Sequence, residues 1–118
     1  MTYSVVIIED EVEVAQLLAQ YLLLPNGIAG NQTPKQSLRQ AQYQVVGIAG
    51  NLSTATALLH AIEPDLILLD IHLPDGNGLD LLTDLRRRTI KSEVMLLTAA
   101  KEVETLEKAM QLGACDFL

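Results

Sequence analysis

Side chains that could bind a metal ion or act as a nucleophile follow three aliphatic runs of this 118-residue sequence. They are Glu9 and Asp10 after the first run, Asp70 after the second and Thr98 after the third. If the runs are parallel strands of one sheet, their carboxyl ends meet at one edge, where ligands bind in open α/β sheets. Three carboxylates gathered there repel each other and stay ionised only when a cation lies among them.

The chemistry of these groups favours Mg²⁺ and phosphoryl transfer. Carboxylate oxygens with room for water and a phosphate oxygen suit Mg²⁺ better than Zn²⁺, because no Cys or paired His lies nearby. Aspartate is one of the side chains that can accept a phosphoryl group covalently. We therefore predict Asp70 as the nucleophile and Thr98 as a hydroxyl donor to the transferred group.

The elements that must position these groups are short strands covered on both faces. The aliphatic runs at 5–8, 66–69 and 94–97 are too short for buried helices and do not alternate with polar residues, as is typical of parallel strands. Residues 44–49 predict a weaker strand, and 116–118 begin a fifth.

Helical patterns separate the predicted strands. Ser53 is a candidate N-cap for the second helix, and Pro64 ends it. The alternation of strands and helices predicts an α/β fold, a doubly wound parallel five-stranded sheet with right-handed crossovers. The apolar stripes of the four helices are Val14, Leu17, Leu18, Tyr21 and Leu22; Ala55, Leu58, Leu59 and Ile62; Leu81, Leu82 and Leu85; and Val103, Leu106 and Met110.

One polar segment, at about 25–44, interrupts this rhythm as an insertion. It contains five glutamines, and a connection of that length without secondary structure is unusual. Thr33, Pro34 and Gln36 form a cap, a first-turn proline and a capping-box partner, which predict a short helix at about 34–42.

Composition limits the functions open to the chain. A formal charge of −7 with only eight Lys and Arg argues against direct nucleic-acid contact by this segment. The single Cys115 cannot form an internal disulfide, and the N-terminus lacks the features of a signal peptide, so a cytoplasmic location is expected. No apolar run approaches the ~20 residues that a membrane helix needs.

Four motifs resemble the receiver domain of two-component response regulators. They are IIEDE at 7–11, LLDIHLPDGNGLDLL at 68–82, LLTA at 96–99 and LGACDFL at 112–118. The combination of LPDGNGLDLL with TAAKEVETLEKAMQLGACDFL is similar to the regulators paired with citrate and C4-dicarboxylate sensor kinases. The resemblance covers one receiver domain over 1–118 apart from the insertion, and it implies a flavodoxin-like fold with strand order 2-1-3-4-5.

The resemblance also implies roles for individual residues. A sensor histidine kinase would phosphorylate Asp70, with Mg²⁺ as the cofactor. Asp10 would bind the ion directly, Glu9 through water, and the backbone carbonyl of His72 would complete the protein ligands. Thr98 would then move toward the phosphoryl group.

The same resemblance implies a switch rather than an enzyme. Phe117 would turn inward behind Thr98 and move the fourth helix. The output would be transcriptional, through a DNA-binding domain of the same protein, with possible homodimer formation on phosphorylation.

The chain departs from the family pattern at its end. The family has a lysine two residues beyond Leu118, followed by a proline and a final helix. Lys101 cannot replace that lysine, because it precedes the fourth helix instead of following the fifth strand. We expect the lysine, the final helix and the output domain beyond residue 118.

Other interpretations of the same residues remain open. Asp10 could cap the first helix with Glu13 as its capping partner, which is compatible with metal binding. A dehalogenase-type phosphatase needs a second acid two residues after the nucleophile, where this chain has His72. A flavin-binding protein needs a hydroxyl and glycine-rich loop after the first strand, where this chain has EDEVEV. A receiver-like interaction module that works without phosphorylation stays possible.

Overall fold

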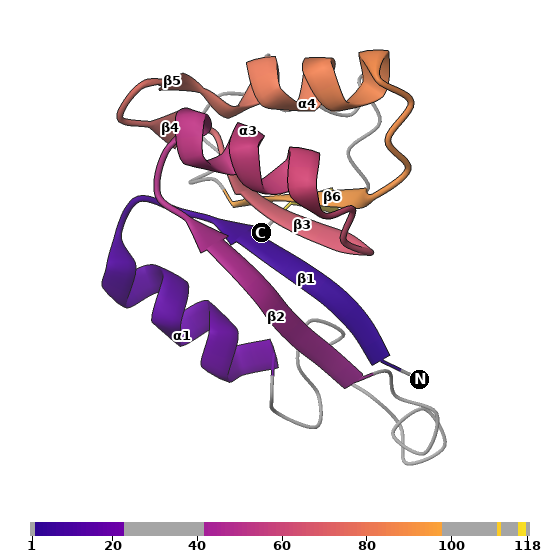
Figure 1. The fold of residues 1–118 in the computed structure, drawn as a ribbon. Helices are drawn as coiled ribbons and strands as arrows, with labels where there is room; N and C mark the ends of the chain where they lie inside the picture. Colours follow the sequence, from indigo (N-terminus) through magenta and orange to yellow (C-terminus); the bar gives the residue numbers. More distant parts are fainter. Residues whose placement is uncertain (1, 23–41, 98–110, 112–115, 118) are drawn as a thin grey trace.

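A five-stranded parallel sheet organises the chain in a computed structural model that describes residues 2–22, 42–97, 111 and 116–117 (Figure 1). The strand order is β2-β1-β3-β6-β7, and each neighbouring pair is parallel. The labels β4 and β5 belong to a separate small sheet, so β6 and β7 are the fourth and fifth strands of this one. Numbered within the sheet, the order is 2-1-3-4-5, and the predicted topology is confirmed. The strands are β1 (Thr2–Ile8), β2 (Gln42–Ala49), β3 (Leu66–Asp70), β6 (Glu93–Leu97) and β7 (Asp116–Phe117).

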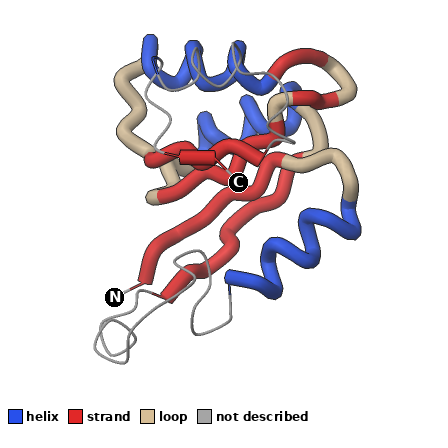
Figure 2. The backbone as a smooth tube through the Cα atoms, turned by 180° about the vertical axis from the view of Figure 1, so that it is seen from behind, coloured by secondary structure: helices blue, strands red, loops and turns tan. Residues whose placement is uncertain are grey.

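Helices cover both faces of the sheet, as a doubly wound fold requires. Helix α1 (Val12–Leu22) lies on one face, and α3 (Leu52–Ala61) and α4 (Gly78–Arg87) lie on the other. The view from behind shows the same separation, with α1 apart from the other two helices (Figure 2). None of the described helices is long and apolar enough to cross a membrane.

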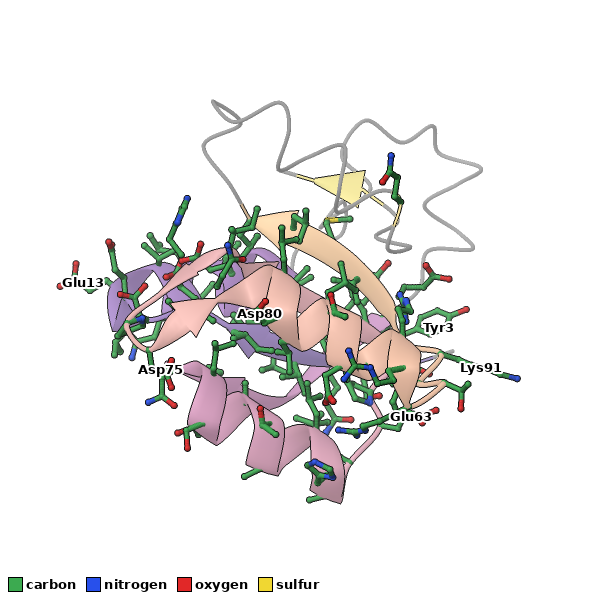
Figure 3. All side chains as sticks on the ribbon, turned by 90° about the horizontal axis from the view of Figure 1, so that it is seen from above. Tyr3, Glu13, Glu63, Asp75, Asp80 and Lys91 are labelled. Carbon is green, nitrogen blue, oxygen red and sulfur yellow. The ribbon has the colours of Figure 1, made fainter. Side chains whose placement is uncertain are left out.

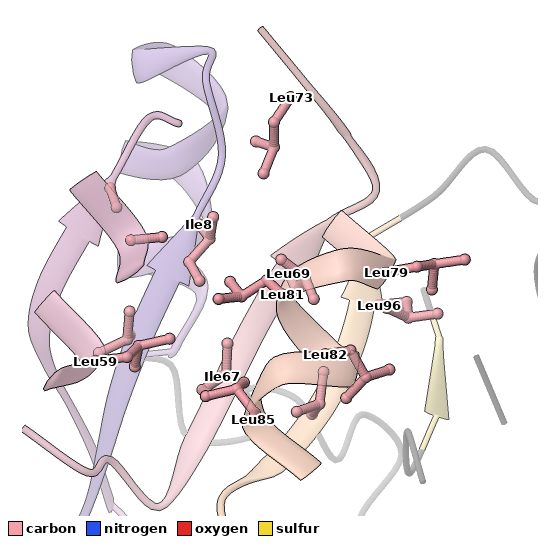
Figure 4. Packing of buried hydrophobic residues seen from close by; sticks show 14 of the residues in the cluster. Ile8, Leu59, Ile67, Leu69, Leu73, Leu79, Leu81, Leu82, Leu85 and Leu96 are labelled. Carbon is pink, nitrogen blue, oxygen red and sulfur yellow. The ribbon is translucent and has the colours of Figure 1, made fainter. Parts of the chain in front are cut away.

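Alternation along the strands divides the buried side chains between two cores, because successive strand residues point to opposite faces. Val6 and Ile8 of β1 pack toward α3 and α4, whereas Val5 and Ile7 pack toward α1. All four of these side chains are fully buried. Ile8 is labelled among the residues of the first core in Figure 4. The central strands therefore contribute to both cores, which explains their continuous apolar runs.

The apolar stripe predicted for α4 is confirmed, but that predicted for α1 is partly wrong. Leu81, Leu82 and Leu85 of α4 are all buried. In α1, Leu17 is 64% exposed, whereas Ala15 is buried in the core. The packed face of the helix therefore combines the small Ala15 with Leu18 and Leu22 and leaves out Leu17.

The N-cap of α3 is Asn51 and not the predicted Ser53. The Asn51 side chain accepts a hydrogen bond of 2.7 Å from the amide of Thr54, and the helix begins at Leu52. It ends at Ala61, before Pro64, as predicted.

Strand β2 forms an edge of the described sheet and begins at Gln42, two residues earlier than predicted. The helix predicted at about 34–42 therefore cannot include Gln42, and the rest of the insertion up to residue 41 lies outside the described residues. The helix predicted over 103–110 also lies outside them.

Candidate metal and phosphoryl site

The register of the central strands places the candidate acids at one level. Ile8 of β1 is the partner of Leu69 of β3, so the residues that follow, Glu9 and Asp70, lie side by side at the carboxyl ends of these strands. The amide of Glu9 donates a hydrogen bond of 2.9 Å to the carbonyl of Ala49, which ties the end of β1 to the end of β2.

Glu9, Asp10 and Asp70 come together as the sequence predicts. One carboxylate oxygen from each lies within 4.8 Å of those of the other two. Glu9 is only 9% exposed, Asp70 is half-buried and Asp10 is exposed. The three acids therefore span the boundary between the core and solvent, and a ligand can reach them from the solvent side.

Crowding and burial make the charge on Glu9 unfavourable. Burial, followed by contacts with Asp10 and the nearby charge of Asp70, raises the pKa of Glu9 from 4.5 to about 7, although the Glu11 amide opposes this shift. That amide donates a hydrogen bond of 3.2 Å to Glu9 Oε2. A cation at this position would favour the ionised carboxylates.

The segment after Asp70 is a tight hairpin whose first residue, His72, binds the Asp70 side chain. The amide of His72 donates a hydrogen bond of 3.1 Å to Asp70 Oδ1. Strand β4 (His72–Leu73) pairs with the antiparallel strand β5 (Gly76–Asn77), a pairing that the sequence did not predict. The hairpin therefore fixes one oxygen of Asp70 and leaves the acid at the open end of the sheet.

Gly78 closes the base of this hairpin. Its amide donates a hydrogen bond of 2.7 Å to the carbonyl of Ile71. A Cβ at this position would overlap the backbone carbonyl of Asp70, so only glycine allows this close approach. The Asn77 side chain accepts from the amide of Leu79 at 2.8 Å and begins α4.

The donor set fits Mg²⁺. All three side chains offer hard oxygen ligands, which Mg²⁺ prefers. Oxygens bound to one Mg²⁺ at about 2.1 Å lie roughly 3–4 Å apart, so the observed cluster suits binding after a small movement or with one ligand acting through water. The spacing is therefore compatible with the expected roles, in which Asp10 binds the ion directly and Glu9 binds it through water.

The remaining predicted site residues are only partly described. His72 lies in β4 beside Asp70. Phe117 lies in β7, where its backbone is level with Leu96 of β6, but its side chain is outside the described part. Thr98 and Lys101 also lie outside it. Helix α1 begins at Val12, so the position directly before it is not Asp10, the N-cap in the alternative interpretation.

Asp75 forms a contact in this region that the sequence did not predict. Asp75, at the tip of the hairpin, accepts hydrogen bonds from the amides of Leu52 and Ser53 at the start of α3. These partners are more than twenty residues away in the sequence, so no local pattern could indicate the pairing. The sequence offers only an acidic residue, Asp75, between a proline and a glycine.

The geometry described above agrees with a comparison to known families. The model of the response regulator receiver domain matches residues 29–118, which is most of the chain. The chain belongs to this family. The match leaves out the segment with Glu9 and Asp10, but curated relatives that match 98% of the chain include it.

Two curated relatives cover nearly the whole chain. The transcriptional regulatory protein MalR of Bacillus subtilis is 35% identical over 98% of this receiver domain and 43% of its own length. The transcriptional regulatory protein CitB of Klebsiella pneumoniae is 34% identical over the same shares. The predicted resemblance to citrate-type regulators is confirmed, and the chain spans less than half the length of these relatives.

A solved structure supports the fold. The signal receiver domain of a DNA-binding response regulator from Colwellia psychrerythraea is 26% identical, with a TM-score of 0.73, and the match covers 98% of this chain and 84% of that one. The receiver is a regulatory rather than a catalytic domain. Receiver domains generally depend on Mg²⁺, in agreement with the acidic cluster.

Proposed function

We propose that this receiver domain accepts a phosphoryl group on Asp70 from a sensor histidine kinase, with Mg²⁺ held at Glu9, Asp10 and Asp70. The observation that carries this proposal is the convergence of the three carboxylates within 4.8 Å at the carboxyl ends of β1 and β3. The backbone carbonyl of His72 is the proposed fourth protein ligand.

Asp70 is suited to act as the nucleophile. The His72 amide binds Oδ1, so Oδ2 is the oxygen proposed to attack phosphorus. Its electron pair forms the new O–P bond while the N–P bond of the kinase phosphohistidine breaks. The leaving imidazole nitrogen keeps the pair of the broken bond and takes a proton from solvent.

The charge of the three acids explains the need for a cation. A phosphoryl group brings further negative charge to a site that already raises the pKa of Glu9 to about 7. When bound, Mg²⁺ supplies positive charge that neutralises the transferred group. Glu9 and Asp10, on the loop after β1, would hold that charge beside Asp70.

The output follows from the family. Thr98 is the proposed hydroxyl partner of the phosphoryl group, and Phe117 the proposed switch residue in β7. Their rearrangement converts a local change of charge into an altered surface. Because the relatives MalR and CitB are transcriptional regulatory proteins, we propose a transcriptional output through a DNA-binding domain of the same protein, with homodimer formation on phosphorylation as a possible intermediate step.

Beryllofluoride, a phosphoryl analogue, tests this proposal. We expect Mg²⁺ alone to shift backbone resonances at the acidic cluster in a ¹H–¹⁵N spectrum, and beryllofluoride to shift the resonances around Asp70 further, only when Mg²⁺ is present. Asp70→Asn should abolish the response. Asp80→Asn, which makes the same change of charge at an exposed position of α4, should retain it (Figure 3).

Two outcomes contradict the proposal. A wild-type spectrum that beryllofluoride leaves unchanged in the presence of Mg²⁺ would favour an interaction module that works without phosphorylation. An equal response of the Asp70→Asn protein would show that the analogue binds elsewhere.

A further inference from the structure

The hairpin that follows Asp70 is tied to a second loop by a single side chain. Asp75 Oδ1 accepts a hydrogen bond of 2.7 Å from the amide of Leu52, and Oδ2 accepts one of 3.0 Å from the amide of Ser53. Figure 3 places Asp75 between the hairpin and the beginning of α3. Both oxygens of the carboxylate are thus used in one bidentate contact.

Helix α3 does not depend on Asp75 alone for its cap. The first turn of a helix leaves four amides without partners inside the helix. Asn51 accepts from the amide of Thr54, whereas Asp75 accepts from those of Leu52 and Ser53. The first turn of α3 is therefore capped by two residues, Asn51 next to the helix and Asp75 of the β4–β5 hairpin.

A second contact supports the same junction. Gly76 has φ of 152°, which L side chains rarely adopt, and a Cβ there would lie 2.6 Å from Leu52 Cδ1. The backbone of the hairpin tip therefore packs directly against the side chain of the first helical residue. The amides of Leu52 and Ser53 also lower the pKa of Asp75, in agreement with hydrogen bonds to its ionised form.

The loop before α3 in turn borders the loop that carries the other two acids. The amide of Glu9 donates a hydrogen bond to the carbonyl of Ala49, and a Cβ on Gly50 would lie 3.8 Å from the Cα of Asp10. Three loops, after β1, β2 and β3, are thus in contact around the acidic cluster. Asp75 is the side chain that joins the third loop to the second.

We propose that Asp75 is a positioning residue for the cation site, which holds the β4–β5 hairpin, and with it the backbone of His72, at a fixed place relative to Glu9 and Asp10. This inference rests on the proposed function, because it assigns the purpose of the contact to the same site. Asp75 touches neither the cation nor the phosphoryl group in this account.

Magnesium titration of matched variants tests the inference. Asp75→Ala should weaken Mg²⁺ binding in calorimetry by about tenfold, as is common when a residue that orients a ligand is lost. Asp75→Asn, which keeps one acceptor oxygen, should give a smaller loss. Asn51→Ala removes a cap of the same helix without touching the hairpin, and should leave the affinity for Mg²⁺ within about twofold of wild type.

A measurement without metal gives an independent readout. Hydrogen exchange of the His72 amide, which binds Asp70, should become faster in Asp75→Ala than in Asn51→Ala. Equal Mg²⁺ affinity of wild type and Asp75→Ala would overturn the inference, as would equal losses in Asp75→Ala and Asn51→Ala, since those would indicate only helix capping. Failure of the wild-type protein to bind Mg²⁺ would instead overturn the proposed function, while the exchange rates would still decide whether Asp75 holds the hairpin.

Discussion

Glu9→Gln should stabilise the metal-free protein at pH 8 and leave its stability nearly unchanged at pH 5. A carboxyl whose pKa is raised by folding binds its proton more tightly in the folded state than in the unfolded state. The stability that this proton provides is complete below the unfolded pKa of 4.5 and is lost as pH rises through the folded pKa of about 7. At pH 8 the wild-type protein therefore has an ionised Glu9 beside Asp10 and Asp70. The Gln variant is neutral at every pH.

The size of the effect follows from the shift of the Glu9 pKa. A rise from 4.5 to about 7 corresponds to an upper limit of about 3 kcal/mol at 1.36 kcal/mol per unit. Solvent at the open side of the cluster screens part of this repulsion, so we expect about 1–2 kcal/mol. For a domain of this size that is a rise in the melting temperature of roughly 4–8 °C.

Thermal and urea unfolding followed by circular dichroism in EDTA would measure this difference, since the chain has no Trp for fluorescence. Glu63→Gln, at an exposed position (Figure 3), controls for the loss of one negative charge and should change stability little at either pH. Added Mg²⁺ should stabilise the wild-type protein more than Glu9→Gln. A Gln variant that is less stable than wild type by the same amount at both pH values would refute the account of Glu9.

Four further substitutions test the packing that positions the site. Gly78→Ala should push its new Cβ against the backbone of Asp70 and lower both the melting temperature and the rate of phosphorylation by acetyl phosphate, measured by intact mass; normal values of both would contradict the close approach. Leu82→Ala, at a fully buried position, should lower the free energy of unfolding in urea by about 2–5 kcal/mol, whereas Leu17→Ala, at a position 64% exposed, should change it by less than about 0.5 kcal/mol. Equal losses would mean that α1 packs through the stripe predicted from sequence. Ser92→Ala should cost about 1 kcal/mol in the same assay, because the buried hydroxyl donates to a backbone carbonyl after α3, and an unchanged midpoint would show that this bond contributes nothing.

The parts of the fold that local sequence determines could be predicted. Aliphatic runs identified β1, β3 and β6, because strands buried on both faces must be apolar throughout. The acids that end two of these strands followed directly from that assignment, since parallel strands bring their carboxyl ends together. The strand order came from the resemblance of the motifs to receiver domains, and the register of Ile8 with Leu69 agrees with it.

The parts that depend on distant contacts could not be predicted. Leu17 and Ala15 are both apolar, and only the position of the sheet decides which of them is buried. The N-cap of α3 is Asn51 and not Ser53, and Asp75 from a distant loop binds the next two amides of the helix. Predicting that two residues far apart in the sequence cap one helix requires the three-dimensional path of the chain.

The most direct test of the central claim is to locate the phosphoryl group and measure its dependence on Mg²⁺. The protein would be treated with acetyl phosphate over a range of Mg²⁺ concentrations, reduced with borohydride to convert an aspartyl phosphate to homoserine, and sequenced by tandem mass spectrometry. The account predicts modification at Asp70 alone, at a rate that rises with Mg²⁺ to saturation and falls when Asp10 is changed to Asn. Modification at another residue, or at Asp70 with the same rate in EDTA, would contradict it.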